Sequence, residues 1–508
     1  MNDPIRKIVV VGGGTAGWMV AAMLGHQAQG QAAVELIESD EIGTIGVGES
    51  TIPPFVYLLR KLEIDEQDFI KATHASFKLG IQFRDWRRKG ETYFHPFGSI
   101  GGQLDIHDFY DCWLKAKTKG HPSRLLDFAP AAVMAEQGRF MLPFKAEGTP
   151  IGGAGYALHV DAKHVAAYLR RFAEAKGVVR TEGMVTEVVT RPGDGFIEKV
   201  RLKDGREVEG DLFIDCSGFR ALLIEKALGV GYVDWSDVLL CDRAVAIQTT
   251  NVGDTHPYTV AHAEDCGWRW RIPLQHRAGN GYVYSSRHIS DDEAVATLMS
   301  RITGEPLIKP NIIPFRTGVR EKIWHKNCVS IGLASGFIEP LESTAIHLVY
   351  RAMDYLLRYF PDRTCAPALA DEFNRRIRTE YEEIRDFIVL HYCMTERDDT
   401  PFWAEYKAMA PTPSLQAKID LFREAATLRE GVDELFREVS WRSVMEGMGV
   451  HPKRYHPLVD RLPYSVIENT LDQAGPRMAQ FVSTLPTHDE FLAKVCPAPK
   501  LDLTPVTV

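Results

Sequence analysis

Cysteine is scarce and without pattern in this chain, which has 8 cysteines among 508 residues and no C-x-x-C or C-x-H spacing. That scatter excludes a disulfide framework and gives a zinc site no support, so no metal is expected and a reducing cytoplasm is the expected compartment. No apolar run reaches the roughly eighteen residues of a transmembrane helix, and the N-terminus lacks the separate apolar segment of a signal peptide. No membrane partner is therefore expected.

An excess of positive charge is also missing. The net charge is -9 at pH 7, so a nucleic-acid partner has no support. What remains is an ordinary globular composition, with 45% hydrophobic and 25% charged residues. The length allows roughly two to four domains, or one large fold with insertions.

A glycine-rich turn near the N-terminus organises the chain. The segment 7–24 reads KIVVVGGGTAGWMVAAML: a β-branched apolar run, a glycine turn and an apolar helical pattern. This order predicts a buried parallel strand that leads into a dinucleotide-binding turn, with the pyrophosphate on the N–H groups that open the helix. The residues of the turn expected to hold the dinucleotide are Gly12, Gly14, Thr15, Ala16 and Gly17.

The stretch VELIES predicts a second strand that ends at Glu38, with Ser39 directly after it. A carboxylate about 20 residues beyond the glycines suits a ribose hydroxyl, which favours FAD or NAD over NADP. The alternative is a tight turn that binds no ligand. A second glycine fingerprint is missing from the sequence, so an independent nicotinamide domain is not expected.

The segment 76–86, SFKLGIQFRDW, alternates like a strand. The alternation leaves two interpretations of Lys78, which is either a solvated lysine on a sheet face or a cation beside aromatic neighbours. Residues 93–98, YFHPFG, predict a loop punctuated by proline and glycine, and this loop carries His95 and Phe97.

The middle of the chain returns to the dinucleotide domain. Asp161 is the expected N-cap of a helix over 161–178, which Gly177 closes. Residues 187–218 predict strands joined by Gly-Asp-Gly and Asp-Gly turns. Later, Trp268 and Trp270 stand two apart and hence on one face of a strand, for which a packed aromatic ladder is the plain interpretation.

Residues 328–360 predict a strand, the turn EPLEST and a helix with Ser343 or Thr344 as its N-cap. A helix that starts just after Glu342 suits an anion or a flavin carbonyl. Glu342 itself is ambiguous, because an acid near a helix start is often only a partner of the helix dipole.

Taken together, the glycine turn, SFKLGIQF, GWRWRIP and EPLEST resemble the FAD-dependent tryptophan halogenase family over nearly the whole chain. The W-x-W-x-I-P signature of that family is present as Trp268, Trp270, Ile272 and Pro273. The resemblance implies an α/β fold: a flavin monooxygenase-like FAD-binding module of the Rossmann βαβ type, with β-sheet insertions and a mostly helical C-terminal substrate module. We expect the FAD-binding module over residues 1–105, 150–230 and 310–360, and the substrate module over 106–149, 231–309 and 361–508.

The resemblance also implies the chemistry. A separate NAD(P)H flavin reductase supplies reduced FAD without a stable complex, oxygen and halide yield a hypohalous acid, and this acid reaches a lysine beside the aromatic substrate. Lys78 matches that lysine, either as a haloamine or as a hydrogen-bond donor, and Glu342 matches the active-site glutamate. The physical requirement agrees, because electrophilic substitution on indole needs only a positioned halogen donor and a base for the released proton. A homodimer is left open.

Further roles follow from the same resemblance. Thr344 and Ala345 match the halide position, and Ser343 the link between substrate and flavin. The additional cofactor-binding residues are Val47, Val185, Leu333 and Ile346. His95 and Phe97 match residues that line or sandwich the indole, Trp441 is counted with them, and Trp268 and Trp270 are expected to screen the flavin.

Two positions depart from the family pattern. Trp441 and Arg442 replace the paired tyrosines that help to clamp free tryptophan, so we expect an indole-type aromatic rather than the free amino acid as the specific substrate. Ala345 replaces a glycine beside the halide position, and we expect bromide to be used at least as well as chloride. The alternatives are free tryptophan as the substrate, a flavin monooxygenase that hydroxylates an aromatic, and a non-catalytic binding module with the FAD fold.

Overall fold

The computed structural model describes residues 3–27, 30–42, 48–146, 148–429, 431, 433–501 and 503–506. The chain forms two compact units, each built from three segments. The first unit comprises Met1–His74, Val160–Asp242 and Pro314–Glu382, and the second comprises Ala75–His159, Arg243–Ile313 and Glu383–Val508. Most of the predicted FAD-binding module falls in the first unit, whereas residues 75–105, 150–159 and 310–313 fall in the second. None of the helices within the described ranges is both long and apolar enough to span a bilayer.

A six-stranded sheet forms the centre of the first unit, in the order β20-β21-β12-β1-β2-β8. Its strands are β1 (Lys7–Val11), β2 (Ala33–Glu38), β8 (Val179–Glu182), β12 (Leu212–Asp215), β20 (Trp324–His325) and β21 (Cys328–Ser330). β1 runs parallel to both β2 and β12. Apart from Lys7, every residue of β1 is buried, as expected for a β-branched strand in the middle of a parallel sheet. The predicted strand–turn–helix unit and the return of the chain at β12 are thus confirmed.

Helix α1 is central among the helices of the first unit, and its apolar residues are buried. These helices are α1 (Thr15–Gln27), α2 (Pro54–Lys61), α3 (Glu66–Thr73), α6 (Ala162–Ala175) and α8 (Ala345–Arg358). Both α6 and α8 lie against α1. Asp161 caps α6 by accepting the N–H groups of Lys163 and His164, at 3.0 and 3.3 Å, so the expected cap is confirmed.

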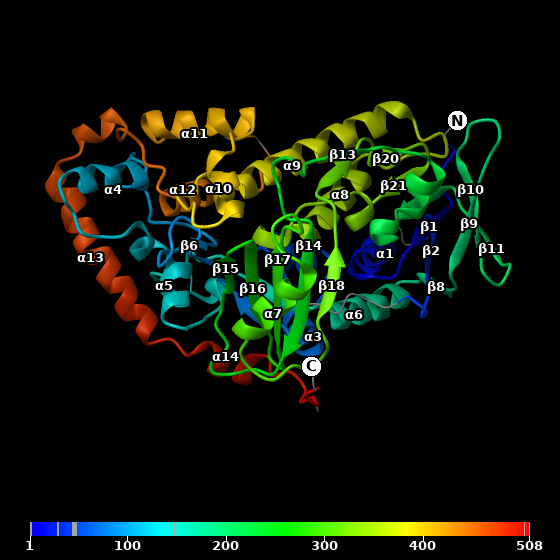
Figure 1. Ribbon diagram of the computed structural model, residues 1–508, viewed down its shortest axis with the longest axis horizontal. Helices are drawn as coiled ribbons and strands as arrows, with labels where there is room; N and C mark the ends of the chain where they lie inside the picture. Colours follow the sequence, from blue (N-terminus) through cyan, green and yellow to red (C-terminus); the bar gives the residue numbers. More distant parts are fainter. Residues whose placement is uncertain are drawn as a thin grey trace. The chain divides into compact units, whose positions relative to one another are not determined.

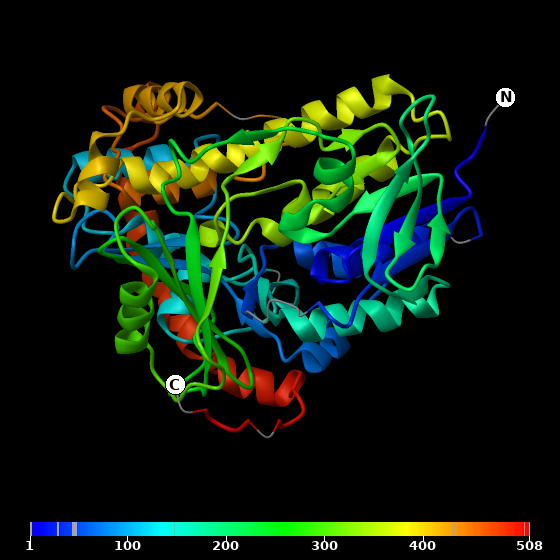
Figure 2. The ribbon, with the colours of Figure 1, turned by 45° about the vertical axis from the view of Figure 1, so that its right-hand side comes forward.

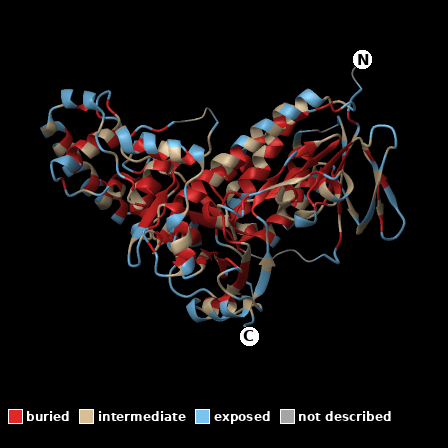
Figure 3. Cartoon of the chain, turned by 45° about the horizontal axis from the view of Figure 1, so that its top comes forward, coloured by how far each residue is buried: buried red, intermediate tan, exposed pale blue. Residues whose placement is uncertain are grey.

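A smaller antiparallel sheet of β9 (Val185–Thr190), β10 (Ile197–Leu202) and β11 (Glu207–Glu209) also belongs to the first unit (Figure 2). Its inner side chains, among them Ile197 and Val200, join a buried cluster with Val9 and Phe213 of the parallel sheet. Residues on its other face are exposed (Figure 3). A third sheet contains β13 (Tyr232–Asp234), β19 (Gly318–Arg320) and β22 (Gly336–Phe337).

The second unit contains a seven-stranded sheet in the order β18-β14-β17-β16-β15-β5-β6 (Figure 1). Its strands are β5 (Gly80–Arg84), β6 (Thr92–Pro96), β14 (Arg243–Thr249), β15 (Thr259–Glu264), β16 (Gly267–Pro273), β17 (Ala278–Tyr284) and β18 (Asn311–Pro314). Helix α7 (Asp291–Arg301) packs on β14 and β17.

The C-terminal part of the second unit is helical, as predicted. Its helices are α10 (Pro401–Ala408), α11 (Pro413–Ala425), α12 (Glu438–Gly447), α13 (Tyr464–Ser483) and α14 (His488–Val495). The earlier helices α4 (Phe109–Thr118) and α5 (Pro130–Glu136) belong to the same unit, and α9 (Pro367–Cys393) is divided between the two. The α/β fold class with a mostly helical C-terminal part is confirmed.

Two predicted local structures are wrong. The segment 76–86 is not one strand, because the backbone bends at Leu79, whose N–H donates to Pro257 O at 2.7 Å. Strand β4 (Ser76–Lys78) pairs with β7 (Ala157–Asp161), whereas β5 joins the seven-stranded sheet. Residues 92–96 form the edge strand β6 instead of a loop, and an edge strand tolerates the proline at position 96.

Candidate active site

The glycine turn of the first unit has the geometry of a dinucleotide cradle. Gly12 adopts φ +116°, and a Cβ there would lie 2.2 Å from the carbonyl oxygen of Cys216. A Cβ on Gly17 would lie 1.8 Å from the carbonyl oxygen of Gly12. A Cβ on Gly14, in contrast, would meet no heavy atom within 4 Å. Gly12 and Gly17 are thus needed for packing, while the space around Gly14 is open, as the approach of a pyrophosphate to the backbone would require.

Glu38 ends β2 beside this turn, as predicted. Its Oε1 accepts from Arg180 Nε at 2.6 Å, and its Oε2 accepts from Trp18 Nε1 at 3.3 Å. Ser39 follows and is buried, and its Oγ accepts the N–H of Glu41 at 3.3 Å. An oriented carboxylate with further lone pairs fits the hydroxyl groups of a ribose, so the residues present fit the adenosine part of FAD.

The segments predicted to line the flavin come together in the first unit. A Cβ on Gly332, just before Leu333, would lie 2.8 Å from Ala16 Cβ and 3.7 Å from Val349 Cγ2. The turn at Leu333 therefore lies against both the glycine turn and α8, the helix that carries the buried Ile346.

Val185 begins β9, two residues after Gly183, whose N–H donates to Glu38 O at 2.8 Å. The partly buried side chain of Val185 packs against the core of the first unit. Val47, the remaining predicted cofactor contact, lies outside the described residues.

Glu49 is a candidate site residue that the sequence argument missed. Its carboxyl group hydrogen-bonds the Thr15 side chain at the start of α1. Burial and the nearby charge of Asp161 raise the pKa of Glu49 from 4.5 to about 7. Such a shift marks functional sites. The signal in the sequence was an acid inside the glycine-rich stretch that follows the second strand.

The start of α8 has no side-chain cap. Thr344 is the N-cap residue, but its side chain makes no capping hydrogen bond, and its buried Oγ1 has no partner among the described residues. Ser343 has φ +60°, and Glu342 is 0% exposed. Because the first N–H groups of a helix lack intrahelical acceptors, the start at Ala345 suits an anion such as a halide. The expected helix N-terminus is confirmed.

Lys78 is 0% exposed in the second unit, so the solvated-lysine interpretation is wrong. Its Nζ lies 5.0 Å from the centre of the Phe97 ring, within reach of a cation–π interaction. The buried charge next to an aromatic ring is the arrangement expected for a functional lysine. Glu342 belongs to the first unit.

An aromatic cluster surrounds His95, which is 2% exposed. Its ring lies 6.1 Å from Phe97, 5.6 Å from Phe387 and 6.0 Å from Phe436, measured between ring centres. Phe387 stacks on Phe436 at 3.8 Å and meets Trp441 edge-on at 4.9 Å. The second unit thus brings together the three predicted substrate contacts His95, Phe97 and Trp441, with Phe387 and Phe436 as members that the sequence argument missed.

Arg442 is already neutralised by acids of its own unit. Its Nη1 lies 3.0 Å from Asp108 Oδ1, and its Nη2 lies 3.0 Å from Glu438 Oε2. The guanidinium also lies 4.9 Å from the centre of the Tyr110 ring. Two carboxylates thus pair with the terminal nitrogens, whereas the buried Nε of Arg442 has no hydrogen-bond partner among the described residues.

Trp268 and Trp270 lie on one face of β16, as predicted, with ring centres 6.2 Å apart. Both are buried, and Trp268 also packs near Trp86. Gly281 on the paired strand β17 makes room for Trp270, because a Cβ there would lie 2.1 Å from the indole. Packing accounts for both residues, and screening of the flavin remains a prediction.

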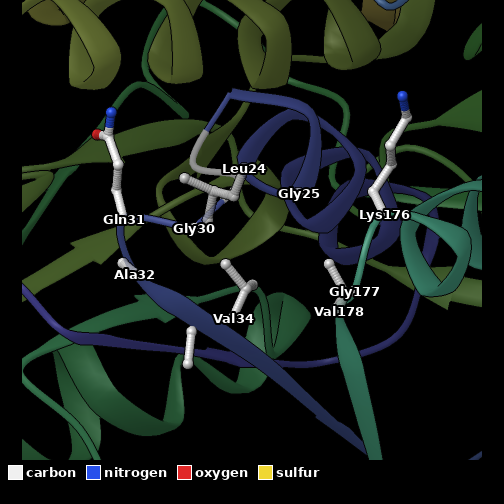
Figure 4. Close-up of a pocket in the computed structure, with 10 residues that line it drawn as sticks. Leu24, Gly25, Gly30, Gln31, Ala32, Val34, Lys176, Gly177 and Val178 are labelled. Atoms are coloured by element: carbon white, nitrogen blue, oxygen red, sulfur yellow. The ribbon is translucent and has the colours of Figure 1, made fainter.

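A cavity of about 330 Å³ lies at the other end of α1, between Leu24, Val34 and Val178 (Figure 4). Leu24 lies nine positions after Thr15, which corresponds to roughly 14 Å along a helix. None of the predicted site residues lines this cavity, so it is separate from the glycine turn.

The chain is similar to known halogenases over almost its whole length. A sequence profile described as tryptophan halogenase matches residues 7–464. The chain is 37% identical to tryptophan 7-halogenase RebH of Lentzea aerocolonigenes, over 97% of this chain and 99% of that protein. A flavin-dependent halogenase structure from Xanthomonas campestris has a TM-score of 0.94 and 44% identity, covering 98% and 100% of the two chains. BrvH, a flavin-dependent halogenase from Brevundimonas sp. BAL3, has a TM-score of 0.93 and 42% identity, covering 97% and 99%.

The two glycines of the cradle should respond differently to alanine. Gly12→Ala clashes with a backbone carbonyl and is expected to lower the free energy of unfolding by about 2–4 kcal/mol. Gly14→Ala fills open space and is expected to change that free energy by less than about 0.5 kcal/mol. It should nevertheless weaken FAD binding at least about tenfold. Urea unfolding without FAD and fluorescence titration with FAD measure the two effects, and unchanged FAD affinity in Gly14→Ala would contradict this geometry.

The raised pKa of Glu49 predicts a pH-dependent stability difference. Between the unfolded value of 4.5 and the folded value of about 7, the folded state keeps a proton that the unfolded state has released. Stability from this group is therefore fully present below pH 4.5 and is lost as the pH rises through 7. We expect the Tm of the native chain to fall relative to that of Glu49→Gln between pH 5 and 8, measured without FAD. A constant difference would show that Glu49 titrates normally.

Proposed function

This chain is a member of the tryptophan halogenase family of flavin-dependent enzymes, and we propose that it brominates or chlorinates an indole-type aromatic with Lys78 and Glu342 as the reacting groups. The observation that carries the proposal is the complete burial of the Lys78 ammonium against an aromatic ring. Burying a charged group is costly, and hydroxylation does not require a lysine in this place.

The reaction of the two groups balances as an electrophilic substitution. A carbon of the indole ring forms a bond to the halogen of hypohalous acid, and the oxygen–halogen bond breaks. Lys78 donates a proton to the leaving oxygen, which departs as water, and Glu342 accepts the proton that the ring carbon releases. Proton exchange with solvent restores both groups. A haloamine on Lys78 is the alternative route to the same product.

FAD fits the first unit, where Gly14 and Glu38 would hold its pyrophosphate and ribose. When bound in its reduced form, FAD supplies the reaction of oxygen that oxidises the halide. We propose that a separate NAD(P)H flavin reductase provides reduced FAD, which is supported by the single glycine fingerprint of the chain. Trp268 and Trp270 are proposed to screen the flavin.

The halide is proposed to bind at the start of α8. The uncapped N–H groups beyond Thr344 and its buried, unpartnered Oγ1 supply donors for an anion. Ser343 lies between this position and Glu342 and is proposed to link the substrate and flavin sites.

The substrate is proposed to be an indole without a recognised amino-acid part. His95, Phe97 and Trp441 offer faces and edges to an aromatic ring. Arg442, the cation that takes the place of a tyrosine clamp, is paired with Asp108 and Glu438. This pairing weakens the case for free tryptophan, the substrate named for RebH.

One incubation tests the function and the role of Lys78. The enzyme receives FAD, NADH, a flavin reductase and bromide, with indole, tryptophan and larger indoles and phenols, and the product masses are measured. A bromine isotope pair is expected on an indole, and a gain of one oxygen alone would establish a hydroxylase instead. Lys78→Met should lower bromination about a hundredfold or more while FAD binding is unchanged. Retained bromination in Lys78→Met would remove this residue from the mechanism.

The methyl group of Ala345 predicts the halide preference. With equal bromide and chloride in one reaction, we expect brominated product to equal or exceed chlorinated product, because bromide is larger and less strongly hydrated. Ala345→Gly removes the methyl group and is expected to shift the ratio toward chloride. Mostly chlorinated product from the native enzyme would contradict this assignment.

A further inference from the structure

The short strand that carries Lys78 is held by two buried histidines. β4 pairs with β7 on one side, where Ser76 lies opposite His159 and Lys78 opposite Ala157. His488, the first residue of α14, lies 411 positions beyond Phe77, and its Nε2 accepts the Phe77 N–H at 3.1 Å. Both histidines are almost fully buried, with exposures of 0% for His159 and 1% for His488.

The partners of His488 determine its tautomer. The Phe77 N–H can only donate, so Nε2 must present a lone pair. On the other side of the ring, Nδ1 lies 2.7 Å from the carbonyl oxygen of Thr255, which can only accept, so Nδ1 carries the proton. His488 is therefore a neutral imidazole, and protonation of Nε2 would break its bond to the strand. In agreement, burial lowers the pKa of His488 to about 4.

His159 is fixed by the same reasoning. Ser76 Oγ donates its single proton to Pro273 O at 2.5 Å. His159 Nδ1, at 3.2 Å, must then donate to Ser76 Oγ, and Nε2 accepts from Thr259 Oγ1 at 2.9 Å. Burial and the cation of Lys78 lower the pKa of His159 far below its ordinary value. Neither histidine adds a second charge beside the lysine.

We propose that His488 and His159 are positioning residues for Lys78, which hold strand β4 through hydrogen bonds that require both imidazoles to be neutral. They connect the two residues that precede Lys78 to Thr255 and Thr259, and Ser76 itself donates to Pro273 O. A three-residue strand has few ladder bonds of its own, so these contacts determine where the ammonium points. The inference rests on the proposed role of Lys78 in directing the halogenating species.

The test compares His488→Leu, which keeps neither hydrogen bond, with His488→Gln, whose amide offers one donor and one acceptor. Holoenzyme is supplied with bromide, indole and an added β-diketone that captures hypobromous acid released into solution. With a displaced Lys78, more of the oxidant escapes, so the ratio of brominated diketone to brominated indole should rise at least tenfold in His488→Leu. His488→Gln should restore much of the native ratio. A protein that is merely less stable would lose both products in proportion.

Hydrogen exchange provides a readout that does not depend on activity. In His488→Leu, the peptide that covers β4 should exchange faster, whereas the peptide that covers β14 should not change. His451→Leu, at an exposed histidine of the same unit, is the matched control for both measurements. If His488→Leu does not fold, Thr259→Val takes its place, because this change removes the hydroxyl that donates to His159 Nε2.

The outcomes separate the two proposals. Faster exchange of β4 with an unchanged product ratio would overturn the positioning role, and so would unchanged exchange. If the native enzyme brominates nothing, the proposed function fails, and with it the link to Lys78, while exchange still reports whether His488 holds β4. A raised ratio together with faster exchange, partly reversed in His488→Gln, supports the inference.

Discussion

The burial of one ammonium group, that of Lys78, is the constraint on which the second unit depends. A charged group that is 0% exposed is stable only if the surrounding groups compensate for the hydration that it has lost. The structure supplies an aromatic face at Phe97 and two neutral imidazoles behind the strand, at His159 and His488. Neither histidine therefore adds a second positive charge next to the lysine.

A different constraint governs the first unit, where the backbone must allow the close approach of the dinucleotide that we propose it binds. Position 12 requires glycine because a Cβ there would clash with the carbonyl oxygen of Cys216, whereas the space around Gly14 is open. The turn at Gly332 contacts both Ala16 and α8, so it lies between the glycine turn and the helix whose N-terminus at Thr344 has no side-chain cap. The proposed dinucleotide and anion sites therefore both lie on elements of the first unit, whereas the proposed aromatic contacts belong to the second unit.

The sequence predicted what local pattern determines and missed what distant contacts determine. The glycine turn, the strand that ends at Glu38 and the cap at Asp161 follow from spacing within a few residues, and all three are confirmed. The strand over 92–96 was mistaken for a loop because its proline is tolerated only by virtue of the edge position. Neither the position of strand β4 nor the pKa of Glu49 could be predicted from periodicity, since His488 bonds to Phe77 and Asp161 acts on Glu49 from remote parts of the chain.

The pairing of Arg442 has a consequence for selectivity. If a substrate carboxylate found a free cation, the site would reject analogues that lack the carboxylate, because a buried unpaired charge is costly. Asp108 and Glu438 already pair with the two terminal nitrogens of this cation, and in the function that we propose recognition rests on contact between aromatic rings. Apolar contact discriminates only about 10- to 200-fold for each methylene group. In the function that we propose, substrates are therefore distinguished by ring shape and by the direction in which Lys78 presents the halogen, and the proposed positioning of β4 would influence which ring carbon reacts.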